Sequence, residues 1–186
     1  RDLYENYGIM VIMGNYFGAY TKGSGASWSA GTNYLSEAQR QAMLESVRHM
    51  VEEHKDEPYV LMWMLGNEND VSGNSANSTA TNTNAWKYPE VYAKFVEEAC
   101  KMIKKLDDNK HPVGVCNATT RFIKYYAKHS PSIDVLGFNQ YGGPYGFSTL
   151  WNRVKKEFDR PVLITEYGCD SWNEKKKSTC EAYQAR

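Results

Sequence analysis

The sequence has no excess of charge of either sign, because 22 lysine and arginine residues balance 22 aspartate and glutamate residues. Proteins that bind nucleic acid or anionic membranes favour a basic excess, so the composition argues against both partners. No apolar run approaches the ~20 residues that cross a bilayer, and the opening segment "RDLYENYG" lacks the apolar region of a signal peptide. The sequence does not begin with methionine, so we expect it to start within a longer protein. None of these features assigns a compartment.

Patterns for metals, disulfides and nucleotides are also scarce. The four cysteines have no CxxC spacing and are too few for a disulfide scaffold, so free thiols are favoured over a Cys169–Cys180 bridge. The histidines form no ligand set, since His49 and His54 are spaced wrongly for one face of a helix. Phosphate-binding motifs of the GxGxxG or GxxxxGK(S/T) type are absent. The sequence therefore predicts an activity that needs neither a metal nor another cofactor.

What the sequence does contain is an alternation of short apolar segments with amphipathic ones. Helices are indicated between the apolar segments, one beginning at a capping box of Ser36 and Gln39 and another with Pro89 in its first turn. A last helix is expected from residue 177. This alternation predicts an α/β fold with a parallel sheet, either an open doubly wound sheet or part of a (β/α)8 barrel. The predicted strands are residues 8–14, 59–66, 111–117, 133–141 and 160–168.

Two glutamates stand where predicted strands end, Glu68 after "VLMWMLGN" and Glu166 after "RPVLIT". In parallel β/α folds, reactive residues gather at the carboxyl ends of strands. In a flat sheet these two strands would lie roughly 14 Å apart at ~4.8 Å per step. A barrel instead points both side chains into its mouth, within the ~5–5.5 Å of a retaining glycosidase or the ~6.5–9.5 Å of an inverting one. Two carboxyl groups so placed can cleave a glycosidic bond.

The period-two alternation of each strand predicts which residues share a face. It groups each glutamate with apolar or small residues of its own strand on the face that would line the barrel mouth. The predicted sets are Met64, Gly66 and Glu68 on the second strand, Val135, Gly137, Asn139 and Tyr141 on the fourth, and Val162, Ile164 and Glu166 on the fifth.

At these residues the sequence resembles the catalytic TIM barrel of clan A retaining glycoside hydrolases. It is most similar to family 2, which includes β-galactosidases, β-glucuronidases and β-mannosidases. The segment "WMLGNE" resembles the fourth barrel strand, "FNQYGGPYG" the sixth and "VLITEYG" the seventh, while "LYENYGIMVI" is similar to the third strand and "YQAR" to the start of the seventh helix. The resemblance implies that residues 1–186 form a partial TIM-barrel catalytic domain, a (β/α)8 barrel from about strand 3 to helix 7.

The resemblance also implies an activity and its residues. The protein would be a retaining β-glycosidase acting on carbohydrate by double displacement, with Glu68 as acid/base and Glu166 as nucleophile. Asn67 would bind the sugar 2-hydroxyl, Tyr141 would donate a hydrogen bond to Glu166, and Asn139 is a further candidate contact to substrate. The family's first, second and eighth strands have no counterpart, so we expect segments of the parent chain or another chain to complete the barrel. The 186 residues alone need not be active.

Other interpretations stay open. The chain could be a non-catalytic carbohydrate-binding or scaffold fragment, or it could have another clan A activity, as an endo-glycanase or a transglycosylase. The sequence does not specify the sugar. Asn69 and Asp70 are predicted to start a loop rather than to catalyse. The aromatic residues after the first strand could stack on sugars or pack beneath their own loop; they are Tyr16, Phe17, Tyr20 and Trp28.

Overall fold

A computed structural model of the chain describes residues 1–18, 31–71, 82–141, 143–168, 172–173 and 176–180. Within this part, five parallel strands form one sheet whose spatial order follows the order of the chain. A doubly wound sheet reverses its strand order at a switch point, so the sequential order rules out that alternative. The strands are β1 (Val11–Asn15), β2 (Val60–Leu65), β3 (Val113–Asn117), β4 (Val135–Gln140) and β5 (Val162–Tyr167).

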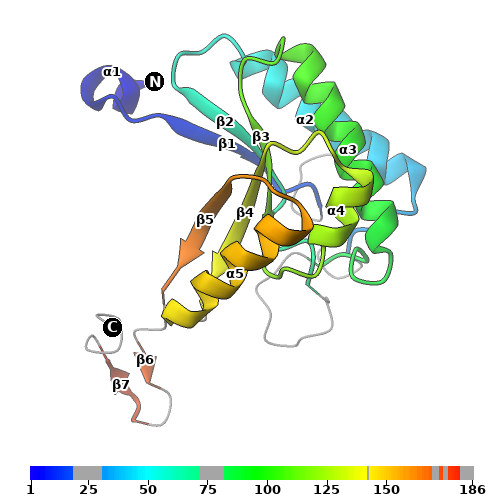
Figure 1. The fold of residues 1–186 in the computed structure, drawn as a ribbon. Coiled ribbons are helices and arrows are strands. Elements are labelled where there is room, and N and C mark those ends of the chain that lie inside the picture. The colour runs from blue at the N-terminus through cyan, green and yellow to red at the C-terminus, as the bar shows by residue number, and fades with distance from the viewer. Residues whose placement is uncertain (19–30, 72–81, 142, 169–171, 174–175, 181–186) are drawn as a thin grey trace.

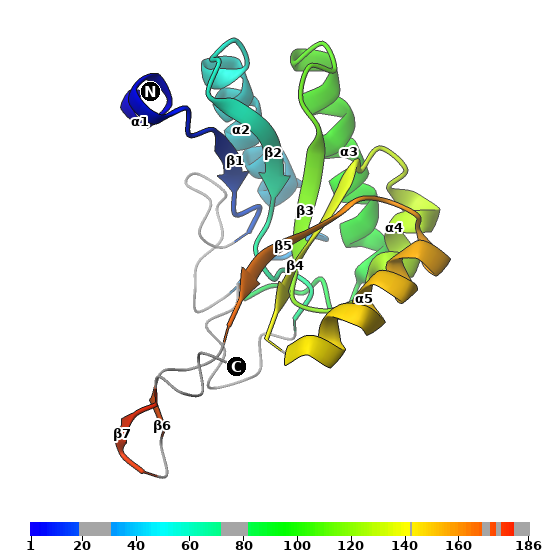
Figure 2. The same ribbon diagram turned by 60° about the vertical axis from the view of Figure 1, so that its left-hand side comes forward.

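Four helices connect the strands and lie on one side of the sheet, which curls into a half-barrel (Figures 1 and 2). Ser36 caps the first of them as predicted, its hydroxyl accepting from Gln39 N, and Pro89 begins the second. Within the described ranges, no helix is both long enough and apolar enough to cross a bilayer. The connecting helices are α2 (Glu37–His54), α3 (Pro89–Leu106), α4 (Ile123–His129) and α5 (Gly143–Glu157), and the short α1 (Asp2–Tyr7) precedes β1.

The predicted last helix is wrong at its start. Ser178 and Thr179 form a short strand, β7 (Ser178–Thr179), which pairs antiparallel with β6 (Trp172–Asn173) away from the main sheet (Figure 1). Serine and threonine rank below the best helix formers, and threonine favours strands, so the local preference does not oppose this pairing. Residues 181–186, the rest of that prediction, lie outside the described residues, as does Cys169 of the weighed disulfide.

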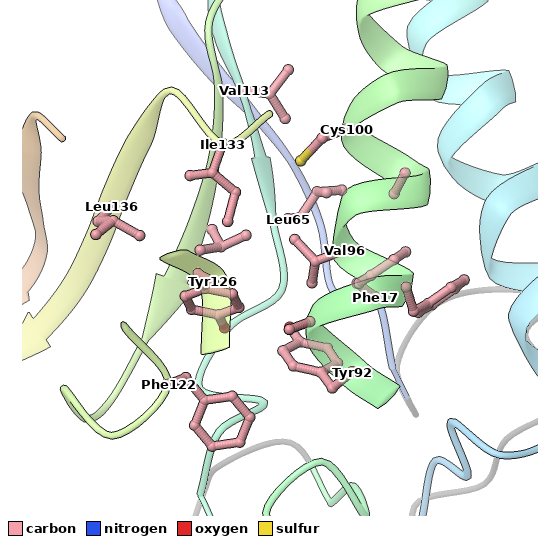
Figure 3. Packing of buried hydrophobic residues seen from close by; sticks show 14 of the residues in the cluster. Phe17, Leu65, Tyr92, Val96, Cys100, Val113, Phe122, Tyr126, Ile133 and Leu136 are labelled. Carbon is pink, nitrogen blue, oxygen red and sulfur yellow. The ribbon is translucent and has the colours of Figure 1, made fainter. Parts of the chain in front are cut away.

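The main core lies between the sheet and the helices. Tyr92, Val96 and Cys100 point from α3 toward the strands, where Leu65 and Val113 meet them (Figure 3). A smaller cluster covers the opposite, inner face of the sheet, which corresponds to the lumen of a barrel. It consists of Met62, Met64 and Cys116, with Val135 and Leu163 packed against it.

These two clusters test the predicted faces. Met64 and Val135 belong to the inner face, consistent with the sets predicted for β2 and β4. The set predicted for β5 is wrong, because Val162 and Ile164 pack against the helix-side core while Leu163 packs against the inner cluster. Simple alternation would therefore place Glu166 on the same side as Ile164, facing the helices.

A bulge in β5 changes that outcome. Phe138 pairs with Ile164, but the next pair is Asn139 with Glu166, so Thr165 is left without a partner in β4. An extra residue of this kind locally interrupts the alternation of side chains between the two faces. Residues paired across neighbouring strands share a face, so Glu166 lies on the same face as Asn139. The expected position of Glu166 at the inner face is reached, though not together with Ile164.

Candidate active site

Glu68 stands in a tight turn that follows β2. Gly66 and Glu68 both have left-handed backbone, with φ of 71° and 55°. Glutamate seldom adopts positive φ, and such strain persists where neighbouring structure fixes it. Here Gly66 N donates to Asn15 O at 2.7 Å and Glu68 N donates to Cys116 O at 3.2 Å, which ties the turn to β1 and β3. The turn thereby presents Glu68 at the carboxyl end of the sheet.

Asn139 of β4 contacts both predicted residues of the turn after β2. Its Nδ2 donates to Glu68 Oε1 at 2.9 Å and to Asn67 Oδ1 at 3.2 Å. The Asn139 side chain is buried, whereas Asn67 and Glu68 are half-buried. Since Asn139 holds the oxygen of the Asn67 amide, the nitrogen of that amide is directed to the other side. Three of the five predicted site residues thus form one hydrogen-bonded group.

Glu166 and Tyr141 form the second group. The Tyr141 hydroxyl donates to Glu166 Oε2 at 2.6 Å, which is the hydrogen bond implied by the family resemblance. A phenol donor at this distance holds the carboxylate in one orientation. Both side chains are exposed, so this group lies at an open end of the inner face.

The thiol of Cys116 lies between the two groups. The pKa of Cys116 is raised to about 11, chiefly by burial; a hydrogen bond with Thr165 opposes the rise, and the negative charges of Glu166 and Glu68 contribute to it. Both carboxylates therefore lie near enough to act on one inward-facing sulfur. A thiol with so high a pKa stays protonated at neutral pH and acts as a weak hydrogen-bond donor. Its Sγ lies 3.4 Å from Asn67 Oδ1.

Sequence reasoning missed Thr165 and Cys116 as members of this site. Thr165 Oγ1 donates to Asn139 Oδ1 at 2.7 Å, and Cys116 Sγ lies 3.3 Å from the same oxygen. Alternation from Leu163 would have placed Thr165 at the inner face, but the predicted set for β5 assigned the inner face to Ile164 and Glu166 instead. For Cys116 the available signal was its position near the end of a predicted strand.

Asn69 is a loop-start residue, as predicted, and its amide is buried. Its Nδ2 lies 3.0 Å from Tyr16 O and 3.1 Å from Phe17 O, which joins the turn after β2 to the loop after β1. Phe17 is fully buried and stacks on Phe95 with ring centroids 4.4 Å apart, so the packing interpretation is confirmed for Phe17. Tyr16 is exposed. Tyr20 and Trp28 lie outside the described residues.

Asp70 is fully buried, and its contacts are with a neighbouring loop. Its carboxylate accepts from Ala118 N at 2.8 Å, from Thr119 N at 2.8 Å and from Thr119 Oγ1 at 2.6 Å. Burial raises the pKa of Asp70, and these three donors oppose that rise. Asp70 therefore fastens the turn that carries Glu68 to the loop after β3.

Replacing Asp70 by alanine is expected to lower the free energy of unfolding by about 2 kcal/mol, because three donors at a buried site lose their acceptor. Urea-induced unfolding of the protein that carries this chain measures the change. Asp56→Ala is a matched control, since Asp56 pairs with Lys110 at the surface and such pairs contribute little. Equal effects of the two substitutions would contradict the structural role of Asp70.

No group of three or more His, Cys, Asp or Glu side chains in the described residues is arranged to hold a metal ion.

Comparison with known families gives a match along nearly the whole chain. Residues 1–184 match the family described as "Glycosyl hydrolases family 2, TIM barrel domain". The match spans both glutamates and every strand of the sheet.

Solved structures give the same fold. The β-D-glucuronidase of Dictyoglomus thermophilum matches 98% of this chain with a TM-score of 0.59 and 19% identity, over 31% of its own chain. A β-glucuronidase of an uncultured Clostridium matches 98% with a TM-score of 0.57 and 21% identity, over 30% of its chain. The β-galactosidase of Marinomonas ef1 matches 93% with a TM-score of 0.66 and 12% identity, over 40% of its chain. The present chain thus spans less than half the length of each.

Proposed function

The chain belongs to family 2 of the glycosyl hydrolases, through the TIM barrel domain of that family, and from this premise we propose that the protein carrying it is a retaining β-glycosidase. Glu68 is its acid/base and Glu166 its nucleophile. The observation that supports this most strongly is that Asn139 links the two glutamates: its amide donates to Glu68 Oε1 at 2.9 Å, and its backbone pairs in register with Glu166. Double displacement requires two carboxyl groups on the same face of the active site, and the contacts of Asn139 are consistent with that arrangement.

In the first step of the proposed reaction, Glu68 gives its proton to the oxygen of the leaving group. Glu166 attacks the anomeric carbon, the glycosidic bond breaks, and a covalent glycosyl ester forms. In the second step, Glu68 takes a proton from water, which attacks the same carbon and releases Glu166. Each displacement inverts the anomeric centre, so the product keeps the configuration of the substrate.

The neighbouring residues have supporting roles. Tyr141 donates to Glu166 Oε2 and keeps the nucleophile oriented for attack. Asn139 donates to both Asn67 and Glu68, which holds the Asn67 amide in place, and Asn67 would bind the sugar 2-hydroxyl. A hydrogen bond to that hydroxyl strengthens as positive charge develops on the ring. We assign Asn139 to positioning these two groups, and contact with substrate is an additional role.

The stereochemistry of turnover tests the proposal directly. We expect the protein carrying this chain to hydrolyse an aryl β-glycoside with the β-anomer of the free sugar appearing first in the proton NMR spectrum, before mutarotation. The solved relatives are named β-glucuronidase and β-galactosidase, so 4-nitrophenyl β-D-glucuronide and β-D-galactoside are the first substrates to try. The corresponding α-glycosides serve as the control.

An α-anomer formed first would contradict the proposed double displacement. Sugar binding without turnover of any aryl glycoside would instead support a non-catalytic carbohydrate-binding role. Because the sheet described here has open edges at β1 and β5, the test uses the protein with all its barrel strands rather than the 186-residue chain.

A further inference from the structure

We propose that Thr165 and Cys116 are positioning residues that lock the carboxamide of Asn139 in one orientation, with its NH2 group toward Glu68. This inference deepens the proposed function and rests on it, because the lock matters only if Glu68 exchanges a proton with substrate. Neither Thr165 nor Cys116 needs to touch the sugar. Their contribution is to decide which end of the Asn139 amide the acid/base meets.

The hydrogen bonds of the Asn139 amide support this orientation. Its two N–H groups have two acceptors, Glu68 Oε1 at 2.9 Å and Asn67 Oδ1 at 3.2 Å. Its oxygen faces two donors, the Thr165 hydroxyl at 2.7 Å and the Cys116 thiol at 3.3 Å. An amide has two donors and an acceptor oxygen; both N–H groups have an acceptor, and the oxygen accepts from Thr165 and shares the single thiol proton of Cys116 with Asn67 Oδ1. The thiol also lies 3.2 Å from Thr165 Oγ1, which places the two proposed positioning residues in direct contact.

The opposite orientation would interfere with the chemistry. A rotated amide would place its oxygen against Glu68 Oε1, which is repulsive when the carboxylate is ionised. When Glu68 is protonated, however, the rotated oxygen could accept the proton that the leaving group needs. The hydroxyl and thiol on the other side stabilise the oxygen where it is, in both protonation states of Glu68. Burial keeps the thiol protonated, so it remains a donor at neutral pH.

The bulge in β5 brings Glu166 to the same face as its neighbour Thr165. Thr165 has no partner in β4, and its hydroxyl meets Asn139 at the inner face directly before Glu166, which is paired with Asn139 in register. Consecutive residues of one strand thus serve two halves of the site: Glu166 carries the proposed nucleophile, and Thr165 acts on the acid/base through Asn139. A residue next to Glu166 would ordinarily be expected to act on Glu166. An effect of Thr165 on Glu68 therefore distinguishes the two possibilities.

The test is the pH profile of kcat/KM for Thr165→Val, with Thr165→Ser as the matched control, in the protein that carries this chain. Valine keeps the shape of threonine and removes the donor, whereas serine keeps the donor. We expect the basic limb of the profile, which reports loss of the proton from the acid/base, to move up by about 0.5 to 1 pH unit in Thr165→Val. The reason is that Asn139 then donates less to ionised Glu68 and can accept from protonated Glu68. Thr165→Ser should retain the parent profile.

Three results would overturn the inference. Movement of the acid limb alone would show that Thr165 acts through Glu166. An equal loss of rate at every pH would show a packing role only, and an equal effect of valine and serine would exclude the hydroxyl. Should Thr165→Val fail to fold, the pair Cys116→Ala and Cys116→Ser decides: alanine should move the basic limb in the same direction by a smaller amount, and serine should not. An inactive parent protein would overturn the proposed function itself, which separates the two failures.

Discussion

Turnover is expected to fall by about 10⁴-fold or more when Glu166 is replaced by alanine, because the covalent intermediate can no longer form. Azide should restore part of the activity toward an activated aryl β-glycoside, since the small anion can enter the space left by the carboxylate and attack in its place. That attack is a single displacement, so the product should be the α-glycosyl azide. NMR of the isolated azide identifies the anomer.

The control for this experiment is Glu98→Ala, which removes an exposed glutamate of α3 on the helix side of the sheet and should leave kcat unchanged. Absence of the α-azide from Glu166→Ala, in a variant that is folded and binds substrate, would count against Glu166 as the nucleophile.

A second large effect is expected for Glu68→Ala, and it should depend on the leaving group. Loss of general acid catalysis should lower kcat/KM by about 10²- to 10⁴-fold for alkyl or unactivated aryl β-glycosides. A 2,4-dinitrophenyl glycoside needs little protonation, so its glycosyl-enzyme should still form and then accumulate. Azide should attack that intermediate and give the β-glycosyl azide, the anomer opposite to the one expected from Glu166→Ala.

The two azide products therefore assign both roles independently. If Glu68→Ala gave the α-azide and Glu166→Ala the β-azide, the assignments would have to be exchanged. A Glu68→Ala variant whose rate falls equally for good and poor leaving groups would contradict an acid/base role. In that case the left-handed backbone at Glu68 would mark a structural turn alone.

Local sequence patterns determine where the strands lie, whereas the assembly of the site depends on contacts between distant parts of the chain. Strand β2 is readable because it is buried along most of its length and so appears as the continuous apolar run "VLMWML". The end of such a run is also readable, and this located Glu68 and Glu166. The barrel arrangement was less accessible, since the order of strands depends on how the sheet curls rather than on any one segment. The family resemblance supplied that information, together with Tyr141 and Asn139.

What could not be predicted depends on register between strands. Alternation assigned Glu166 to the face of Ile164, and only the pairing of β5 with β4 reveals the extra residue that separates them. The same applies to Cys116 and Thr165, which come from two strands and meet at the amide of a third. Side-chain hydrogen bonds of this kind join residues 23 and 26 positions apart in the chain. No local pattern specifies them.

The bulge at Thr165 has a practical consequence for attempts to transplant this motif into another scaffold. In a regular strand, every second side chain points into the lumen of a barrel. In β5 two successive side chains, Thr165 and Glu166, point there because the pairing with β4 skips one residue. Copying "VLITEYG" onto an ideal barrel would carry over each letter and still aim the glutamate at the surrounding helices. A design would therefore have to reproduce the extra residue of β5 relative to β4, and not only the seven-residue sequence.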